Sequence, residues 1–307
     1  MAADPWIVLA AAAVEGACGY PARLRVPHPV VWIGAALRRL DQALNRGGDL
    51  RRRFAGLLTL LLVAGAAGGA GLLLDRFLQG WALILTIGLG SLGLAARSLY
   101  DHVAAVSRAL GAEDLPAARA AVAMIVGRDT AALDADGVAA AALESLAESF
   151  NDGVLAPLFW FLLGGLAGLF AYKAVNTADS VIGHREEPYR CFGWAAARAD
   201  DLMNLIPARL AGALVALAAG RGWRIMLRDA ARHASPNSGW PEAAMAGALG
   251  VRLGGAASYD GIAHDRPVFG DGPRPSPLDL DRGLGLYLRA CALLAAALAL
   301  GGLAWPR

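Results

Sequence analysis

The chain has 307 residues, carries a formal net charge of +2, and is 57% hydrophobic and 18% charged. Soluble domains are about half apolar and about a quarter charged, so this composition is typical of a protein that interacts with a lipid bilayer. The small net charge argues against nucleic acid as a partner. The 3 cysteines are far apart in the sequence and show neither a disulfide framework nor a CxxC metal site.

Apolar runs in chain order predict the membrane helices, since a helix of about 18–20 apolar residues crosses a bilayer. The strongest runs are 55–74, 81–96, 154–172 and 284–305, and the weaker ones are 6–20 and 202–219. The first run follows an acidic start, so we expect a retained helix rather than a cleaved signal peptide. The sequence therefore predicts an all-α, polytopic integral membrane protein with a single membrane domain over residues 1–307.

Two polar segments precede the run at 154–172. Residues 21–54 contain eight arginines and, by the positive-inside rule, are expected in the cytoplasm. Residues 97–152 are predicted to be a polar helical insert, in which Asp114 caps one helix and Asp134 or Asp136 caps another. We therefore expect a multi-pass protein of the inner cell membrane whose active face is cytoplasmic.

The polar segment 220–283 is predicted to be a loop without strands, because its tract 267–277 is rich in proline and glycine. Glycines inside the apolar runs predict helix packing instead. The string GLGSLG at 88–93 matches the GxGxxG pattern of dinucleotide-binding sites. That pattern requires a strand before it and a helix start after it, whereas this string lies within a predicted hydrophobic helix. The spacing of such small residues permits helix pairing, including homo-oligomer formation.

Carboxylates and an amide mark the start of the run at 154–172. Glu144, Glu148, Asn151 and Asp152 are spaced to share one face of a helix. Like charges at this spacing repel each other, so a cation is expected among them, and Mg²⁺ is the natural ligand of carboxylates beside phosphate oxygens. The alternative is a solvated helix face. We expect Glu148 and Asp152 to be the metal ligands.

A second polar set follows the same run. Lys173, the one lysine of the chain, shares a helix face with Asn176, Thr177 and Ser180. Polar groups beside an apolar run are costly unless they are used or paired, although a lysine can also extend its ammonium group to the interface. The set continues along the chain with the residues Asp179, His184, Arg185, Asp201 and Asn204.

A third set lies in the string HASPNSGWPE. It contains His233, Asn237, Trp240 and Glu242 in a turn-forming context. Pro241 is typical of the first turn of a helix, whose exposed backbone N–H groups can hold a phosphate. An ordinary loop with a helix cap is the alternative.

Taken in order, five strings resemble the adenosylcobinamide-phosphate synthase family of cobalamin biosynthesis. They are GYPARLRVPHPVVWIG, ESFNDGVLAPLFWF, YKAVNTADSVIGHR, FGWAAARADDLMNLIPARL and SPNSGWPEAAMAGALGVRLGG. The resemblance covers essentially the whole chain. Where family members often have SPNAG and NTLDS, this chain has SPNSG and NTADS, which are mild departures.

The resemblance implies an integral membrane enzyme. Its reaction would be the ATP-dependent ligation of (R)-1-amino-2-propanol, or its O-phosphate, to the f-propionate carboxylate of (adenosyl)cobyric acid, with Mg²⁺. The product would be cobinamide or cobinamide phosphate. The partners implied are therefore a corrinoid substrate, the amine and the bilayer. The string GxxxxGK[ST] of a P-loop does not occur, so the sequence does not locate the ATP.

Roles in this reaction are assigned by chemistry as a hypothesis. Lys173 and Arg185 would bind phosphate oxygens, and His184 or His233 would move the proton of the amine. The residues expected to contact substrate are Asn151, Asn176, Asp179, Arg185, Asp201, Asn204, Asn237, Trp240 and Glu242.

A straight helix over 154–172 would hold Asp152 and Lys173 about 30 Å apart, because each residue adds about 1.5 Å. The two could then not share a site. Pro157, the pair Gly164-Gly165 and Gly168 offer breaks. We therefore favour a broken segment that turns back as a re-entrant hairpin, which is allowed where protein buries the backbone.

Two other classes of protein compete with the enzyme. One is a membrane signalling protein of the β-lactamase-regulatory type, which would need neither these polar sets nor the SPNSGWPE loop. The other is a small-molecule transporter. Transporters place polar groups near the middle of the bilayer, whereas here they lie at the ends of the apolar run.

Overall fold

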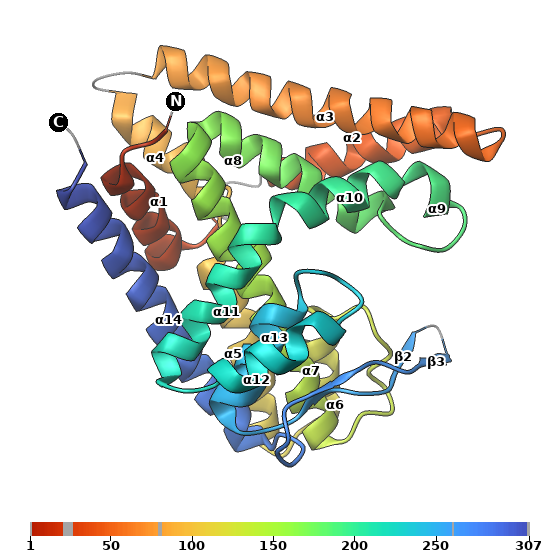
Figure 1. Ribbon diagram of the computed structural model, residues 1–307, viewed down its shortest axis with the longest axis vertical. Coiled ribbons are helices and arrows are strands. Elements are labelled where there is room, and N and C mark those ends of the chain that lie inside the picture. Colours follow the sequence, from red (N-terminus) through yellow and green to blue (C-terminus); the bar gives the residue numbers. More distant parts are fainter. Residues whose placement is uncertain (1, 21–26, 79–81, 260, 306–307) are drawn as a thin grey trace. The chain divides into compact units, whose positions relative to one another are not determined.

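A computed structural model describes residues 2–20, 27–78, 82–259 and 261–305, and these are mainly helical (Figure 1). Within them, 4 helices are long and apolar enough to cross a membrane, or 5 if α10 and α11 form one span. The candidate spans are Asp49–Phe77, Leu83–Gly111, Ala135–Ile182 and Pro277–Leu303. The prediction of an all-α, polytopic membrane protein is confirmed.

The chain divides into two compact units, which are described separately. Unit 1 consists of residues 1–95, 156–204 and 298–307, and unit 2 of residues 96–155 and 205–297. Both units are therefore assembled from segments that are far apart in the sequence.

Unit 1 is a helical unit built around two long helices. Its elements are α1 (Pro5–Cys18), α2 (Pro29–Leu44), α3 (Asp49–Phe77), α4 (Leu83–Ser91), α8 (Ala156–Ile182), α9 (Tyr189–Phe192) and α10 (Trp194–Met203). A core of fully buried side chains, including Leu37, Ile182 and Phe192, joins α2, α8 and α9. Leucine and isoleucine at helical spacing on these faces explain why the helices pack here.

Helix α8 is broken in the middle, as the sequence predicts. Gly165 has φ 60° and ψ −153°, a conformation that side-chain-bearing residues rarely adopt. The chain folds back at this point, because a Cβ added to Gly168 would lie 2.3 Å from the carbonyl oxygen of Trp160. The carboxylate of Asp75 on α3 accepts the N–H groups of Leu166 and Ala167, which begin the second arm. Figure 1 shows this turn in α8.

Unit 2 contains the polar segments. Its helices are α5 (Ala96–Gly111), α6 (Leu115–Ala123), α7 (Ala135–Phe150), η3 (Asn151–Leu155), α11 (Leu205–Ala219), α12 (Trp223–Asp229), η4 (Ala230–Arg232), α13 (Gly239–Leu249) and most of α14 (Pro277–Leu303). Asp114 caps α6 and Asp134 caps α7, each through a backbone N–H three residues on. Both predicted caps are confirmed.

Four short strands correct the prediction that residues 220–283 are a loop without strands. They are β1 (Leu253–Gly254), β2 (Ala257–Tyr259), β3 (Ile262–His264) and β4 (Val268–Phe269). β1 pairs with β4 and β2 with β3, both antiparallel. Helix α12 also falls in this segment, together with α13, whose start beside Pro241 was predicted. Pairing between residues distant in the sequence, which local composition does not reveal, creates this structure.

Several predicted helix boundaries were wrong. The run 81–96 is two helices, since α4 ends at Ser91 and α5 begins at Ala96, and Trp81 lies outside the described residues. The run 202–219 is divided between α10 and α11 at Asn204. Pro241 is the third residue of α13, where its missing N–H is still tolerated because the first turn has no partner for it.

Candidate active site

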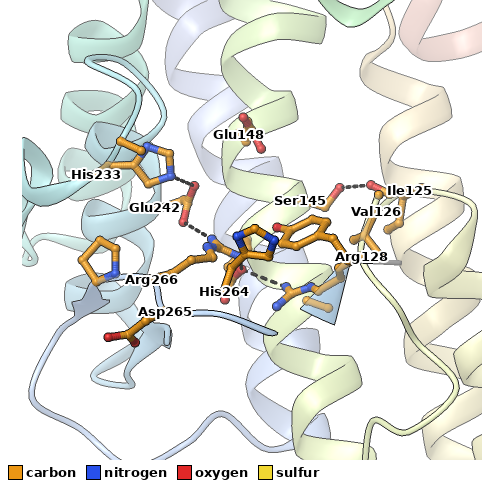
Figure 2. A pocket seen from close by; sticks show the side chains of 16 residues that line it. Ile125, Val126, Arg128, Ser145, Glu148, His233, Glu242, His264, Asp265 and Arg266 are labelled. Carbon is orange, nitrogen blue, oxygen red and sulfur yellow. Dashed lines mark hydrogen bonds and ion pairs between the residues drawn. The ribbon is translucent and has the colours of Figure 1, made fainter. Parts of the chain in front are cut away.

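A pocket of about 480 Å³ lies in unit 2. Four parts of the chain line it. They are one face of α7, the segment 125–128, the residues His233, Ala234 and Glu242 before and within α13, and the β2–β3 hairpin with the residues that follow it. Figure 2 shows side chains of these parts around the pocket, with His233, Glu242 and Arg266 next to one another. The pocket therefore gathers residues separated by more than a hundred positions in the sequence.

Glu144 anchors one wall of the pocket. Its carboxylate lies 2.8 Å from Arg128 and 3.2 Å from Arg266, and it accepts the N–H of Gly254 at 2.8 Å. The side chains of Glu144 and Arg128 are both buried. A buried charge is tolerated where it is paired and hydrogen-bonded, as here. Glu144 thus fixes the two arginines and the start of the short sheet.

His233 and Glu242 form a contact on the opposite wall, with His233 Nε2 3.6 Å from Glu242 Oε1. The backbone N–H of Ser235 donates to Nδ1 of His233 at 2.9 Å. This contact is closer than the 3.3 Å from Nδ1 to the Ser235 carbonyl oxygen, so it favours the neutral tautomer that carries its proton on Nε2, which faces Glu242. The other oxygen of Glu242 lies 3.7 Å from Arg266. Figure 2 shows the three side chains in sequence across the pocket.

Glu242 is only 2% exposed, and its environment favours the protonated carboxyl group. Burial raises the pKa of Glu242 well above its usual value, and the negative charges of Glu148 and Glu144 raise it further. The positive charges of Arg266 and Arg128 oppose this shift but do not outweigh it. Burial also lowers the pKa of His233, so this imidazole is neutral at pH 7.

Glu148 lies on the same face of α7 as Glu144, one turn further along. It is exposed to the pocket, and Ser238 donates a hydrogen bond to its Oε1 at 2.9 Å. Together with Asp265, the lining carries four acidic side chains against the two arginines. The pocket therefore suits a cationic ligand, such as an ammonium group or a metal ion, better than a free phosphate.

The β2–β3 hairpin brings two rings to the pocket. Tyr259 and His264 meet edge to face, with ring centroids 5.5 Å apart. Asp129 holds the hairpin, since it accepts bonds from the hydroxyl of Ser258 at 2.6 Å and the N–H of Gly261 at 2.9 Å. Sequence reasoning did not identify Tyr259, His264 or Arg266. Their clustering between residues 259 and 266 was the only available signal.

The donors in the pocket decide whether Mg²⁺ can bind there. Among the described residues, no group of three or more His, Cys, Asp and Glu side chains is arranged to hold a metal ion. Mg²⁺ typically takes one or two carboxylates and completes its shell with water and phosphate oxygens. Glu148, an exposed carboxylate in the pocket, fits that pattern. The described residues do not form a site in which protein side chains alone surround the metal.

Four other predicted residues also belong to unit 2. Asn151 donates to Asp152 at 2.6 Å within η3, and neither lines the pocket. Asn237 is buried in the turn before α13. Trp240 carries Arg209 over its ring, 4.7 Å from the centroid. Of the predicted residues, the pocket thus brings together Glu148, His233 and Glu242.

The remaining predicted residues belong to unit 1. Lys173 and Asn176 line a separate groove, and Asn176 also donates to Asp200 at 3.3 Å. Asn204 accepts a bond from the hydroxyl of Tyr172. Asp201 pairs with Arg198, and the backbone carbonyl of Asp179 accepts the N–H of Gly183. The ring of His184 lies beside Tyr189. Arg185 is exposed. The roles assigned to these residues stay predictions.

Comparisons with known proteins give consistent similarities. The profile described as CobD/Cbib protein matches residues 8–287. A protein of Rhodobacter capsulatus named "Cobalamin biosynthesis protein CobD" is 50% identical over 97% of this chain and 98% of its own length. Proteins of the same name from Geobacter metallireducens and a Sinorhizobium species are 48% and 46% identical, over 90% and 88% of this chain and 90% and 89% of their own. No solved structure shows significant similarity.

Proposed function

The chain belongs to the CobD/Cbib protein family, and from this premise we propose that it is an ATP-dependent amide ligase of cobalamin biosynthesis. The names of its relatives support the role in cobalamin biosynthesis. The proposed reaction joins (R)-1-amino-2-propanol, or its O-phosphate, to the f-propionate carboxylate of (adenosyl)cobyric acid. ATP supplies the driving force and leaves as ADP and phosphate. The family match favours this role over the signalling and transport alternatives.

The acidic pocket in unit 2 supports a site for the amine. An amine of this kind is an ammonium ion at neutral pH, and the excess of carboxylates over arginines attracts it. The ammonium must lose a proton before its nitrogen can attack an activated carboxyl group such as an acyl phosphate. Amide formation then releases phosphate.

Glu242 is the proposed acceptor of that proton. A carboxylate with a raised pKa is a stronger base than an ordinary one, and it accepts a proton once it has lost its own. His233 would orient it, since the protonated Nε2 of His233 faces Oε1 of Glu242. This assignment reverses the hypothesis from the sequence, in which histidine moved the proton. The reversal is supported by the burial of Glu242 and by the shorter of the two Ser235 contacts at Nδ1, the one with the backbone N–H.

Arg266 and Glu148 complete the proposal. Arg266 would place positive charge beside the developing oxyanion, because its guanidinium group already lies between Glu144 and Glu242. Glu148 would contribute to holding Mg²⁺, which when bound would neutralise phosphate charge. Asp152 does not line the pocket, so its predicted part in metal binding has less support than that of Glu148.

The experiment is a coupled assay of ADP release by the detergent-purified full chain. Release should require cobyric acid together with aminopropanol or its phosphate. Glu242→Gln should lower kcat at least about a hundredfold, in the range typical of a general base. Glu113→Gln, on an exposed residue of unit 2, should leave kcat unchanged. ADP release that ignores both substrates would refute the ligase.

A further inference from the structure

A groove of about 380 Å³ in unit 1 has the opposite electrostatic character from the pocket in unit 2. It lies between α2 and the second arm of α8, which pack together (Figure 1). Arg38 enters it from α2 and Lys173 from α8. Among the described residues no carboxylate lines it. Two cations without an acidic lining residue favour an anionic ligand.

The position of Arg38 is fixed by a small neighbour. Gly34 lies one turn before Arg38, and a Cβ at Gly34 would lie 3.3 Å from Nη1 of Arg38. The guanidinium group therefore rests on the surface of α2 where glycine leaves room, and it is directed to the groove. Its fork of N–H groups matches the oxygens of a phosphate group in pairs.

Lys173 provides the second charge from the other side. Its field reaches the start of α2, because the pKa of His28, lowered mainly by burial, is lowered further by the positive charge of Lys173. Asn176, one turn along α8, adds an amide to the same wall. The rest of the lining includes Val30 and Val31, so the groove offers a charged part beside an apolar part.

We propose that the groove between Arg38 and Lys173 binds a phosphate group whose organic part lies against the valines. Sequence reasoning paired Lys173 with Arg185 for this purpose. Arg185 does not line the groove, and Arg38 takes its place. The phosphate can belong to a soluble phosphorylated metabolite or to a lipid headgroup. Because the inference concerns binding alone, it deepens the proposed function but does not require ligase activity.

The test uses the full chain in nanodiscs of phosphatidylcholine, with inorganic phosphate as the probe and chloride to hold the ionic strength constant. Ligand that binds the folded state raises Tm, and the rise grows with the logarithm of the ratio of ligand concentration to Kd. Arg38→Gln and Lys173→Gln should each raise the Kd for phosphate by about tenfold, the loss expected for one charged hydrogen bond. Lys173→Arg keeps the charge and should retain binding. It also shows that the site tolerates substitution without unfolding.

Arg39→Gln is the matched control, since Arg39 neighbours Arg38 on α2 but does not line the groove. A second arm replaces part of the phosphatidylcholine with phosphatidylglycerol and omits free phosphate. A rise in Tm that depends on Arg38 and Lys173 in this arm identifies a lipid headgroup, and a rise only with free phosphate identifies a soluble ligand. The proposal is overturned if neither probe has an effect that depends on both residues, or if Arg39→Gln weakens binding equally.

Discussion

The carbonyl oxygen of Trp160 faces Gly168 across the turn in α8 so closely that a Cβ on Gly168 would lie 2.3 Å from it. In a continuous helix these two residues would be about 12 Å apart along the axis. The contact therefore records that α8 folds back on itself. It also brings the polar end of the second arm, with Lys173, to a position that a straight span would not allow.

Gly168→Ala is expected to destabilise this turn. Its Cβ cannot fit beside the Trp160 carbonyl unless the two arms separate, which should cost about 1–3 kcal/mol, as overpacking does. Gly164→Ala is the matched control, since nothing lies within 4 Å of a Cβ there. Tm in detergent should fall for Gly168→Ala alone. Equal Tm values for the two variants would contradict the close approach.

Asp75 is expected to hold the second arm of α8 in place. Its two carboxylate oxygens accept the N–H groups of Leu166 and Ala167, at 3.2 and 3.3 Å. Asp75→Ala removes both acceptors and should cost about 0.5–2 kcal/mol, like the loss of a helix cap. Asp75→Asn keeps one acceptor oxygen and should cost less. Thermal unfolding in detergent checks the order, and a larger loss for the asparagine variant would contradict it.

The break in α8 could be predicted because its causes are local. The sequence shows an apolar run that, as a straight helix, would hold its two polar ends far apart. It also shows glycines at 164, 165 and 168, where a helix can break. The caps Asp114 and Asp134 could be predicted for the same reason, since each acts on an N–H three residues away. Predictions of this kind depend on spacing alone.

The arginines of the candidate site could not be predicted, because contacts between distant segments bring them together. The spacing of Glu144 and Glu148 shows that they share a helix face. It does not show that Arg128 and Arg266 reach Glu144, one from 16 residues away and the other from far along the chain. The break between α4 and α5 was also missed, since α4 ends at Ser91 inside an apolar run.

Replacement of Glu242 by glutamine is expected to stabilise the protein at high pH. The folded state raises the pKa of Glu242, so it favours the protonated form. That contribution to stability is complete below the unfolded pKa, about 4.3, and is lost as pH rises through the folded pKa. Glutamine mimics the protonated form and should gain about 1–3 kcal/mol at pH 8. The difference in Tm between variant and parent should shrink toward pH 4.5; a constant difference would contradict it.

Asp229 is expected to act in the opposite direction. It is 1% exposed, accepts two bonds from Arg228 at 2.7 Å and one from the N–H of Gly270, and its pKa is lowered to about 2, chiefly by Arg228. Its stabilisation is present above the unfolded pKa of about 3.9 and is lost as pH falls toward 2.

Asp229→Asn should therefore cost about 2 kcal/mol at pH 7, since it weakens a buried, hydrogen-bonded charge pair. Asp271 is the matched control, because it binds the same Arg228 but its side chain is 66% exposed. Asp271→Asn should cost less than about 1 kcal/mol, as exposed pairs do. Chemical denaturation of the two variants checks this, and equal losses would show that burial does not distinguish the two pairs.

Arg266 is expected to set the pH at which the proposed ligase becomes active. If Glu242 accepts the proton of the amine, the rate rises with pH as Glu242 loses its own proton. The positive charge of Arg266 lowers the pKa of Glu242 against the effect of burial. Arg266→Gln removes that charge, so the rising limb of kcat/KM should move to higher pH. Arg266→Lys keeps the charge and should move it less. The measurement is kcat/KM for ADP release between pH 6 and 9. If the rising limb of the pH profile stays at the same pH in Arg266→Gln while kcat falls, the titrating group is not Glu242. Arg266 would then have a role in binding alone.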